Sequence, residues 1–253
     1  MIKKNQHRSK IIRWFLGSVI LILSVVVAIW LNNFSWIPPK PPLITSPAPD
    51  IIRHSQSTPA WGIDISHHQK KINWNHFQDP HVPNFVFLKA TEGDHFIDNR
   101  FNEYSSQLRA LKIPYSGYHF FRYNVNGEEQ ARFFLSLIRP RKGQLIPVVD
   151  IEDQIYSATQ EVAQINFDLF METMRSAIGV YPIVYCDEKH YHRYIEEKYK
   201  KKVILWIAQY TREPNVEYDI WQKTPRYRHP AFNNRIDYDL LNHSRISLLD
   251  LTL

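Results

Sequence analysis

The sequence predicts an α/β fold, with a (β/α) barrel as the leading architecture and an open, doubly wound parallel sheet as the alternative. Short apolar runs alternate with helical segments along the chain, which is typical of parallel βα units. There are eight such runs, the number of strands in a (β/α)₈ barrel. After about residue 203 the runs follow one another with little helix between them, so we expect the last strands to lack outer helices.

The expected strands are rich in β-branched and aromatic residues. They are Gly62–Ser66, Asn84–Thr91, Tyr115–Phe121, Leu145–Glu152, Val180–Cys186, Val203–Tyr210, Tyr218–Gln222 and Arg235–Leu241. The expected helices are Asn102–Lys112, Gly127–Arg139, Ala158–Ile178 and Glu188–Tyr199. The only cysteine, Cys186, ends an apolar run, so we expect a buried strand residue rather than a nucleophile. One cysteine allows neither an intrachain disulfide nor a cysteine-based zinc site.

The first 60 residues differ in composition from the rest. Residues 1–13 carry five Lys and Arg and no acid, and 18 nearly all apolar residues follow from Trp14 to Leu31. As a helix this run would be about 27 Å long, close to the thickness of a bilayer core. The expected organisation has four parts: a basic cytoplasmic tail at 1–13, a transmembrane signal-anchor helix at 14–36, a Pro-rich linker at 37–60 and the barrel domain at 61–253.

This organisation predicts a single-pass membrane protein whose barrel domain lies on the periplasmic or extracytoplasmic side. A cleaved signal peptide is the rival interpretation, but Ala28-Ile-Trp30 does not supply a small-x-small cleavage site. Residues 1–60 hold seven of the 31 Lys and Arg and one of the 25 acids, so the remainder carries 24 of each sign. The barrel domain therefore has no net charge that would favour nucleic acid, and we expect no such partner.

Two carboxylates close the fourth expected strand, Leu145-Ile-Pro-Val-Val-Asp150-Ile-Glu152. Side chains alternate faces along a strand, so Asp150 and Glu152 would share one face while Ile151 takes the other. Two close carboxylates push their pKa values apart, so that one holds a proton and the other stays ionised. This pair would suit general acid catalysis, as in glycoside hydrolysis, whereas a solvated strand end is the simpler alternative.

The C-terminal ends of the other expected strands are also rich in acids and aromatics. In a (β/α) barrel the working residues lie at these ends. They are Asp64, Ser66, Glu92, Tyr118, His119, Tyr185, Asp187, Trp206, Gln209, Trp221, Gln222, Asp237 and Asp239. Aromatic faces with amide or acid acceptors are what a pyranose ring and its hydroxyls need, so we expect a sugar groove, although each residue alone has an ordinary structural explanation.

The motif Trp61-Gly-Ile-Asp64-Ile-Ser66-His-His-Gln69 resembles the opening motif of glycoside hydrolase family 25 lysozymes, the muramidases, and implies their TIM-like, flattened barrel. Similar motifs follow in order across residues 61–242: Phe85-Val-Phe-Leu-Lys89-Ala-Thr91-Glu92-Gly93, Gly117-Tyr118-His119-Phe120, Pro147-Val-Val-Asp150-Ile-Glu152, Tyr181-Pro-Ile-Val-Tyr185, Leu205-Trp206-Ile-Ala208-Gln-Tyr210, Asp219-Ile-Trp221-Gln222 and Ile236-Asp237-Tyr-Asp239. The chain departs from the family at His68-Gln69 and in the basic, glycine-free segment 225–234, and both departures bear on subsite preference.

The resemblance implies a role for each matching residue. Glu152 matches the family's proton donor to the glycosidic oxygen, Asp150 its companion carboxylate, and Asp64 and Asp237 further acids of the cleft. Tyr118, Trp206 and Trp221 match positions that line the sugar groove, and the other substrate-binding residues expected at strand ends are His119, Glu92, Tyr185 and Gln209. The implied substrate is peptidoglycan, cut at the β-1,4 bond between N-acetylmuramic acid and N-acetylglucosamine without cofactor or metal. Whether Asp150 acts as nucleophile, activates water or orients the N-acetyl group is left open.

Three other functions compete with this interpretation. A metal-dependent hydrolase would use Asp64, His67, His68 and His119, but adjacent histidines in a strand point to opposite faces, which argues against a shared metal. A catalytically inactive, membrane-tethered barrel could bind peptidoglycan or a partner protein, although all four acids are present. A related barrel hydrolase could act on another N-acetylated glycan.

Overall fold

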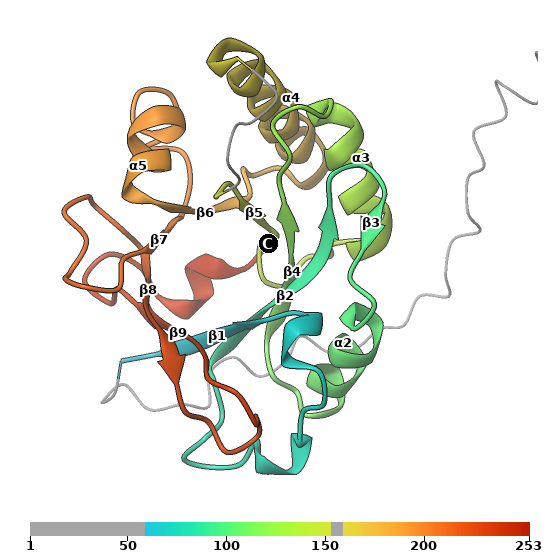
Figure 1. The fold of residues 1–253 in the computed structure, drawn as a ribbon, viewed down its shortest axis with the longest axis vertical. Helices are drawn as coiled ribbons and strands as arrows, with labels where there is room; N and C mark the ends of the chain where they lie inside the picture. The colour runs from blue at the N-terminus through green and yellow to red at the C-terminus, as the bar shows by residue number, and fades with distance from the viewer. Residues whose placement is uncertain (1–58, 153–158) are drawn as a thin grey trace, which may run out of the picture. The chain divides into compact units, whose positions relative to one another are not determined.

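The computed structural model describes residues 59–152 and 159–253, which form a closed β-barrel with helices outside it (Figure 1). Eight strands make the ring: β1 (Trp61–Ile65), β2 (Phe85–Glu92), β4 (Tyr115–Phe120), β5 (Val148–Asp150), β6 (Ile183–Asp187), β7 (Leu205–Ala208), β8 (Ile220–Tyr227) and β9 (Ile236–Leu241). Their order is β1-β9-β8-β7-β6-β5-β4-β2, and β2 pairs with β1 to complete the ring. The predicted barrel is therefore confirmed. The open-sheet alternative is wrong, because the β1–β2 pairing leaves no sheet edge between them.

Strand direction brings the chain's acidic positions to one end of the barrel. From β1 through β2 and β4 to β8, each neighbouring pair of strands is parallel, so the C-terminal ends of these strands meet at one end, called the mouth below. β9 runs antiparallel to both of its neighbours, β8 and β1. The beginning of β9 therefore lies at the mouth beside the ends of the other strands. A short strand, β3 (Phe96–Ile97), pairs with the end of β2.

Helical segments separate most of the strands up to β7: α2 (Phe101–Ala110), α3 (Gly127–Ile138), α4 (Gln160–Ile178) and α5 (Glu188–His190). As predicted, no helix separates β7, β8 and β9 within the described residues. The helix expected over Glu188–Tyr199 is only partly present, because α5 passes after one turn into a π-helical turn, η3 (Tyr191–Ile195). The expected start of α4 at Ala158 lies outside the described residues, and Thr159 caps the helix by accepting a hydrogen bond from the Val162 amide.

Aromatic side chains cover the outer face of β1 and β9, where the barrel lacks a helix. Trp61 stacks on Tyr238, with ring centroids 5.7 Å apart, and Tyr227 packs on both rings. The loop after β8 folds over the same side, and its buried Phe232 contacts Phe77. Burial of these rings supplies the apolar cover that outer helices give to the other strands.

Alternation of side chains along the strands gives two apolar layers. Residues facing out pack under the helices, among them Val149, Ile151 and Cys186, which is fully buried as predicted. Residues facing in fill the barrel below the mouth: Phe85, Phe87, Val148, Ile183, Trp206 and Ile220. The C-terminal segment closes the opposite end, where Leu251 is buried and Thr252 bridges to Leu145. A site inside the barrel can therefore open to the outside only at the mouth.

The predicted cytoplasmic tail and transmembrane helix, with the linker up to residue 58, lie outside the described residues. Within residues 59–152 and 159–253, no helix has the length and apolar character needed to cross a membrane.

Candidate active site

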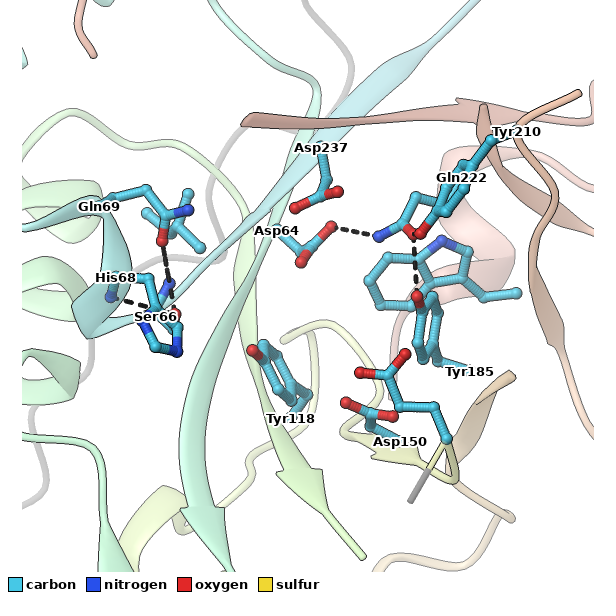
Figure 2. A pocket seen from close by; sticks show the side chains of 13 residues that line it. Asp64, Ser66, His68, Gln69, Tyr118, Asp150, Tyr185, Tyr210, Gln222 and Asp237 are labelled. Atoms are coloured by element: carbon cyan, nitrogen blue, oxygen red, sulfur yellow. Dashed lines mark hydrogen bonds between the residues drawn. The ribbon is translucent and has the colours of Figure 1, made fainter. Parts of the chain in front are cut away.

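A pocket of about 310 Å³ opens at the mouth of the barrel (Figure 2). It is lined by Asp64, Ile65, Ser66, His68, Gln69, Tyr118, Asp150, Glu152, Tyr185, Trp206, Tyr210, Gln222 and Asp237. The four acids expected to be catalytic thus come together, although they are carried by β1, the end of β5 and β9. Three of the expected substrate-binding residues, Tyr118, Tyr185 and Trp206, also line this pocket.

Strand alternation explains why these carboxyl groups point inward. Asp150 lies between Val149 and Ile151, both fully buried in the outer apolar layer, so its own side chain faces the barrel interior. Glu152 follows two residues later and lines the same pocket, and the residue is more exposed than Asp150 although its carboxyl group is partly desolvated. In β1 the flanking Ile63 likewise packs outward, which turns Asp64 toward the pocket.

Gln222 organises one wall of the pocket (Figure 2). Its amide nitrogen donates to Asp64 Oδ2 at 2.8 Å. Its amide oxygen accepts from the hydroxyls of Tyr185 at 2.8 Å and Tyr210 at 2.6 Å. One buried amide therefore fixes the orientation of an acid and two phenols. From the sequence, Gln222 was expected only at a strand end, and Tyr210 only as part of a motif. Neither was given a role, because the hydrogen bond between them joins different segments of the barrel.

Burial and mutual repulsion raise the pKa values of the pocket acids. For Asp64 burial is the largest cause and the charge of Asp237 adds to it, while the Gln222 hydrogen bond opposes the rise in pKa. For Asp150 burial again leads and Glu152 adds repulsion, so its pKa also lies well above the usual 3.8. Its Oδ1 atom is buried without a hydrogen-bond partner among the described residues. One carboxyl group of the pair was expected to stay ionised, whereas the pKa values of both Asp150 and Glu152 are raised.

The two acids at the opening shift in the same direction. Burial of the carboxyl raises the pKa of Glu152 above 4.5, and the negative charge of Asp187 raises it further. Burial raises the pKa of Asp237 to about 6, with repulsion from Glu152 as the second cause. Four carboxyl groups repel one another in one partly desolvated pocket, so the ionised form of each is disfavoured by the others.

A fifth acid lies below the pocket. Asp239 is fully buried, and its Oδ1 accepts a hydrogen bond from Trp206 Nε1 at 3.0 Å. Its Oδ2 has no partner among the described residues, and burial, followed by repulsion from Asp64, holds its pKa well above 3.8. Trp206 packs on Phe87 and Tyr185 at centroid distances of 4.8 and 4.5 Å, so the indole forms part of the pocket floor.

Lys89 supplies positive charge to this acidic region. Its Nζ lies 2.6 Å from Glu92 Oε2 and 4.8 Å from the centre of the Phe120 ring. The ammonium group acts against the rise in pKa of both Asp150 and Glu152. Glu92, which was expected to bind substrate, instead joins Lys89 to Arg122 and does not line the pocket.

Three other residues expected to bind substrate lie outside the pocket. His119 faces the helices, where its Nδ1 lies 2.7 Å from Thr91 Oγ1 and its ring stacks on Phe170. Trp221 lies outside the barrel ring, and its Nε1 donates to the Gln209 carbonyl at 2.7 Å. The Gln209 side chain accepts hydrogen bonds from Thr211. None of the three is among the residues that line the pocket.

The histidines after β1 do not lie in a strand, so the expectation that they point to opposite faces is wrong. They begin a 3₁₀ turn, η1 (His67–Gln69), and their rings lie 4.0 Å apart. His68 lines the pocket, whereas His67 Nδ1 pairs with the buried Asp98 at 2.7 Å. Because His119 lies on the outer face, the residues of the metal-hydrolase alternative are not gathered. Within the described ranges no group of three or more His, Cys, Asp or Glu side chains is placed to hold a metal ion.

Comparison with known proteins finds a matching family and several relatives. The family model described as glycosyl hydrolases family 25 matches residues 63–234. The Escherichia coli K12 protein named "Uncharacterized protein YegX" is 27% identical over 199 residues, which cover 76% of this chain and 72% of the relative. Lysozyme M1 of Streptomyces globisporus is 38% identical over 76 residues, or 30% of this chain and 26% of that protein.

Solved structures share the architecture. A family 25 glycosyl hydrolase from Bacillus anthracis matches with a TM-score of 0.66 at 25% identity, covering 75% of this chain and 91% of that one. A bacterial lysozyme from Streptomyces coelicolor matches with a TM-score of 0.69 at 23% identity, over 77% and 96% of the two chains. A family 25 lysozyme from Aspergillus fumigatus gives 0.66 at 25% identity, over 77% and 97%. The similarity covers nearly the whole of each of these structures.

Proposed function

The chain belongs to glycosyl hydrolase family 25 and is a glycosidase of the muramidase type, and from that premise we propose that it cuts the β-1,4 bond between N-acetylmuramic acid and N-acetylglucosamine in peptidoglycan. The observation that carries the proposal is the convergence of Asp64, Asp150, Glu152 and Asp237 on one pocket at the barrel mouth. The names of the relatives, lysozymes among them, support peptidoglycan as the substrate.

Glu152 is the proposed proton donor to the glycosidic oxygen. The residue is exposed and lines the pocket, so it can reach a bound glycan, whereas Asp239 is fully buried below. Burial and the nearby charge of Asp187 raise the pKa of Glu152, which favours the protonated form that a general acid needs. The same carboxylate, once ionised, can take a proton back from water.

Asp150 and Asp64 are the proposed stabilisers of positive charge on the sugar. As that charge develops, it favours the ionised form of nearby carboxyl groups and so offsets the repulsion that raises their pKa values in the empty pocket. Asp64 is held in place by its hydrogen bond from Gln222, and Asp150 lies on the same pocket with one buried oxygen that has no hydrogen-bond partner among the described residues.

Phenol and indole groups are the proposed sugar contacts. Burial raises the pKa values of Tyr118 and Tyr185 well above 10, so both hydroxyls stay neutral. The Tyr118 hydroxyl can donate to a sugar oxygen, whereas that of Tyr185 donates to Gln222 and can accept from a sugar hydroxyl. Tyr210 is about half exposed at the rim, where its ring can pack against a pyranose face.

Analysis of the products tests the proposal. Purified peptidoglycan is digested with the full chain, reduced with borohydride and examined by mass spectrometry. Cleavage at the proposed bond places N-acetylmuramic acid at every new reducing end, which reduction converts to the muramitol form. Reduced N-acetylglucosamine at the new ends would contradict the proposed bond, and digestion of chitin oligomers in preference to peptidoglycan would favour another N-acetylated glycan.

We also propose that residues 1–60 tether the barrel to a membrane, with the active site on the extracytoplasmic side. The basic tail, the apolar run and the Pro-rich segment of the sequence support this proposal. Cell fractionation compares the full chain with a variant that lacks residues 1–36. The proposal expects only the full chain in the membrane fraction, and equal release of both into the soluble fraction would contradict it.

A further inference from the structure

Two basic segments border one side of the acidic pocket, the side where Gln69, Asp237 and Gln222 lie (Figure 2). One starts with the lysines at positions 70 and 71, directly after Gln69. The other follows Gln222 and covers residues 223–235, with four Lys or Arg and no acid. Each lies at or next to a place where the sequence departs from the family pattern. The glycosidase chemistry of the pocket gives neither segment a role.

The second segment is the part of the β8–β9 hairpin that continues beyond the mouth of the barrel. β8 runs on past Gln222 to Tyr227, and β9 begins only at Ile236. The register of these two strands puts Arg226 in the irregular stretch opposite Asp237, which lines the pocket. The cations of the hairpin therefore lie at the border of the pocket, and none of them is among the lining residues.

Contacts between the two segments join their cations into one surface. The Asn73 amide donates to the Ala231 carbonyl at 2.9 Å, and the rings of Phe77 and Phe232 pack with their centroids 6.0 Å apart. We call this surface the basic rim. It consists of six exposed residues: Lys70, Lys71, Lys223, Arg226, Arg228 and Arg235.

Positive charge is concentrated in the basic rim. Asp79 is the only acid in the two segments taken as residues 66–84 and 223–235, whereas residues 61–253 as a whole carry 24 charges of each sign. Within residues 59–152 and 159–253, no cation of the rim forms an ion pair with a carboxylate. The rim therefore places positive charge that the described residues do not neutralise beside a pocket lined by four acids.

The charges of peptidoglycan indicate what such a surface can bind. In an intact strand the lactyl group of muramic acid is joined to a peptide by an amide bond, so the carboxylates belong to the peptides and the sugar rings are neutral. The four acids of the pocket repel an anionic substrate, and cations at the border of the pocket offset that repulsion. Complementary charge of this kind contributes mainly to specificity.

We propose that the basic rim binds carboxylates of the stem peptides on muramic acid, so that the enzyme selects glycan strands that still carry their peptides. This inference rests on the proposed function, because it takes peptidoglycan as the substrate. A stem peptide branches away from the sugar chain, and the hairpin extends beyond the mouth on one side of the pocket. A glycan bound in the pocket can therefore place a peptide over the rim.

Binding of three soluble glycan fragments tests the proposal. The fragments carry intact peptides, peptides whose carboxylates are converted to methylamides, or no peptides after amidase treatment. The full chain is studied in non-ionic detergent by isothermal titration calorimetry, with Glu152→Gln as the parent so that no cleavage occurs. We expect the parent to bind the intact fragment most tightly.

Removal of charge from the hairpin should abolish this preference. The rim variant adds four substitutions to the parent: Lys223→Gln, Arg226→Gln, Arg228→Gln and Arg235→Gln. Each exposed ion pair contributes little by itself, so the four together should weaken binding of the intact fragment about tenfold. Affinity for the methylamide fragment and for the peptide-free fragment should stay close to that of the parent. A rise in salt concentration should reduce the preference of the parent, because it screens exposed charges.

A control variant removes the same charge from the opposite end of the barrel, where β5 and β7 begin. Its four substitutions, all at exposed positions, are Arg141→Gln, Lys142→Gln, Lys201→Gln and Lys202→Gln. This variant should bind all three fragments as the parent does. The thermal midpoint of the rim variant should stay close to that of the parent, since no ion pair among the described residues is lost.

Equal affinity of the parent for the three fragments would overturn the proposal, and so would an equal loss of affinity in the rim and control variants. Stronger binding to micelles that contain phosphatidylglycerol than to the intact fragment, lost in the rim variant, would also overturn it, because the rim would then face a membrane. These binding measurements need no cleavage, whereas the products of digestion do not depend on the rim. Failure of the rim and failure of the proposed function are therefore distinguishable.

Discussion

The two faces of the barrel sheet treat polar side chains in opposite ways, and the adjacent residues Tyr118 and His119 of β4 illustrate the difference. On the outer face, the two ring nitrogens of His119 lie 2.7 Å from Thr91 Oγ1 and 3.1 Å from Gln130 Oε1. On the inner face, Tyr118 opens onto the pocket, and nearby Asp150 keeps one buried oxygen without a partner. At these neighbouring positions the outer-face side chain has both of its polar atoms partnered, whereas the pocket keeps an unpartnered acid oxygen.

The outer and inner faces of the sheet also differ in the ionisation of their side chains. Burial lowers the pKa of His119 to about 4, so the outer network stays neutral at physiological pH. Burial raises the pKa values of the inner acids, which also repel one another. The outer face therefore contributes stability, while repulsion among the buried acids of the inner face lowers it.

The largest effect is expected at Glu152. Replacement by glutamine keeps the shape but removes the proton donor, so turnover of peptidoglycan should fall by about 10²–10⁴-fold. The thermal midpoint should stay the same or rise, because one of several repelling acids is lost. Glu129→Gln, an exposed change on α3, is the control and should leave both quantities nearly unchanged. Near wild-type turnover of Glu152→Gln, measured with reducing-end assays, would show that another group donates the proton.

A pair of neighbouring substitutions tests the division between the faces. His119→Ala removes a fully buried ring and leaves Thr91 and Gln130 without their partner, so the free energy of unfolding should fall by about 2–4 kcal/mol. Activity per folded molecule should persist. Tyr118→Phe should show the reverse, with activity reduced about tenfold and stability almost unchanged. Denaturant titration and steady-state kinetics measure the two quantities, and similar profiles for both variants would remove the distinction.

The stability of the inner face should depend on pH. Asp237 has a folded-state pKa of about 6 against a usual 3.8, so it supports folding below about pH 4 and loses that contribution as the pH rises through about 6. Asp237→Asn should therefore gain stability over the wild type across this window, by about 1–3 kcal/mol. The exposed Asp94, whose pKa is lowered by the His95 side chain, is the control, and Asp94→Asn should show no such gain. A flat difference between Asp237→Asn and wild type across urea titrations at pH 4–8 would refute the expectation.

A smaller effect is expected at Lys89, whose charge opposes the rise in pKa of Asp150 and Glu152. Lys89→Met should move the alkaline limb of the activity profile to higher pH by about half a unit to one unit, since the acids then hold their protons longer. Lys89→Arg keeps the charge and should restore the limb. Equal profiles for both variants would mean that Lys89 acts only through packing on Phe96 and Phe120.

Local patterns in the sequence predicted every barrel strand, because each strand has an apolar outer side and ends in polar residues. They favoured the closed barrel over an open sheet from the number of strands alone, because closure itself depends on the pairing of β1 with β2. The helix predicted over residues 188–199 is regular only over Glu188–His190, and a π-helical turn follows at Tyr191–Ile195. Helix propensity does not distinguish these two backbone forms.

The acids of the site could be predicted because two-residue alternation places Asp150 and Glu152 on one face. His119 and Trp221 lie one position away from pocket residues, and a single step along a strand turns a side chain to the other face. Glu92 lies beyond a register shift between Lys89 and Thr91, which breaks the simple alternation of β2. The role of Gln222 depends on partners from β1, β6 and the end of β7, so no local pattern could indicate it.

Titration of Glu152 itself tests most directly whether the inner face holds a proton for catalysis. Carbon-13 NMR of the full chain labelled at glutamate side-chain carboxyls follows each group with pH, and the resonance missing from Glu152→Gln assigns the residue. We expect this resonance to titrate above the usual 4.5, because burial and Asp187 favour its protonated form. A midpoint at or below 4.5 would contradict the assignment of Glu152 as the general acid.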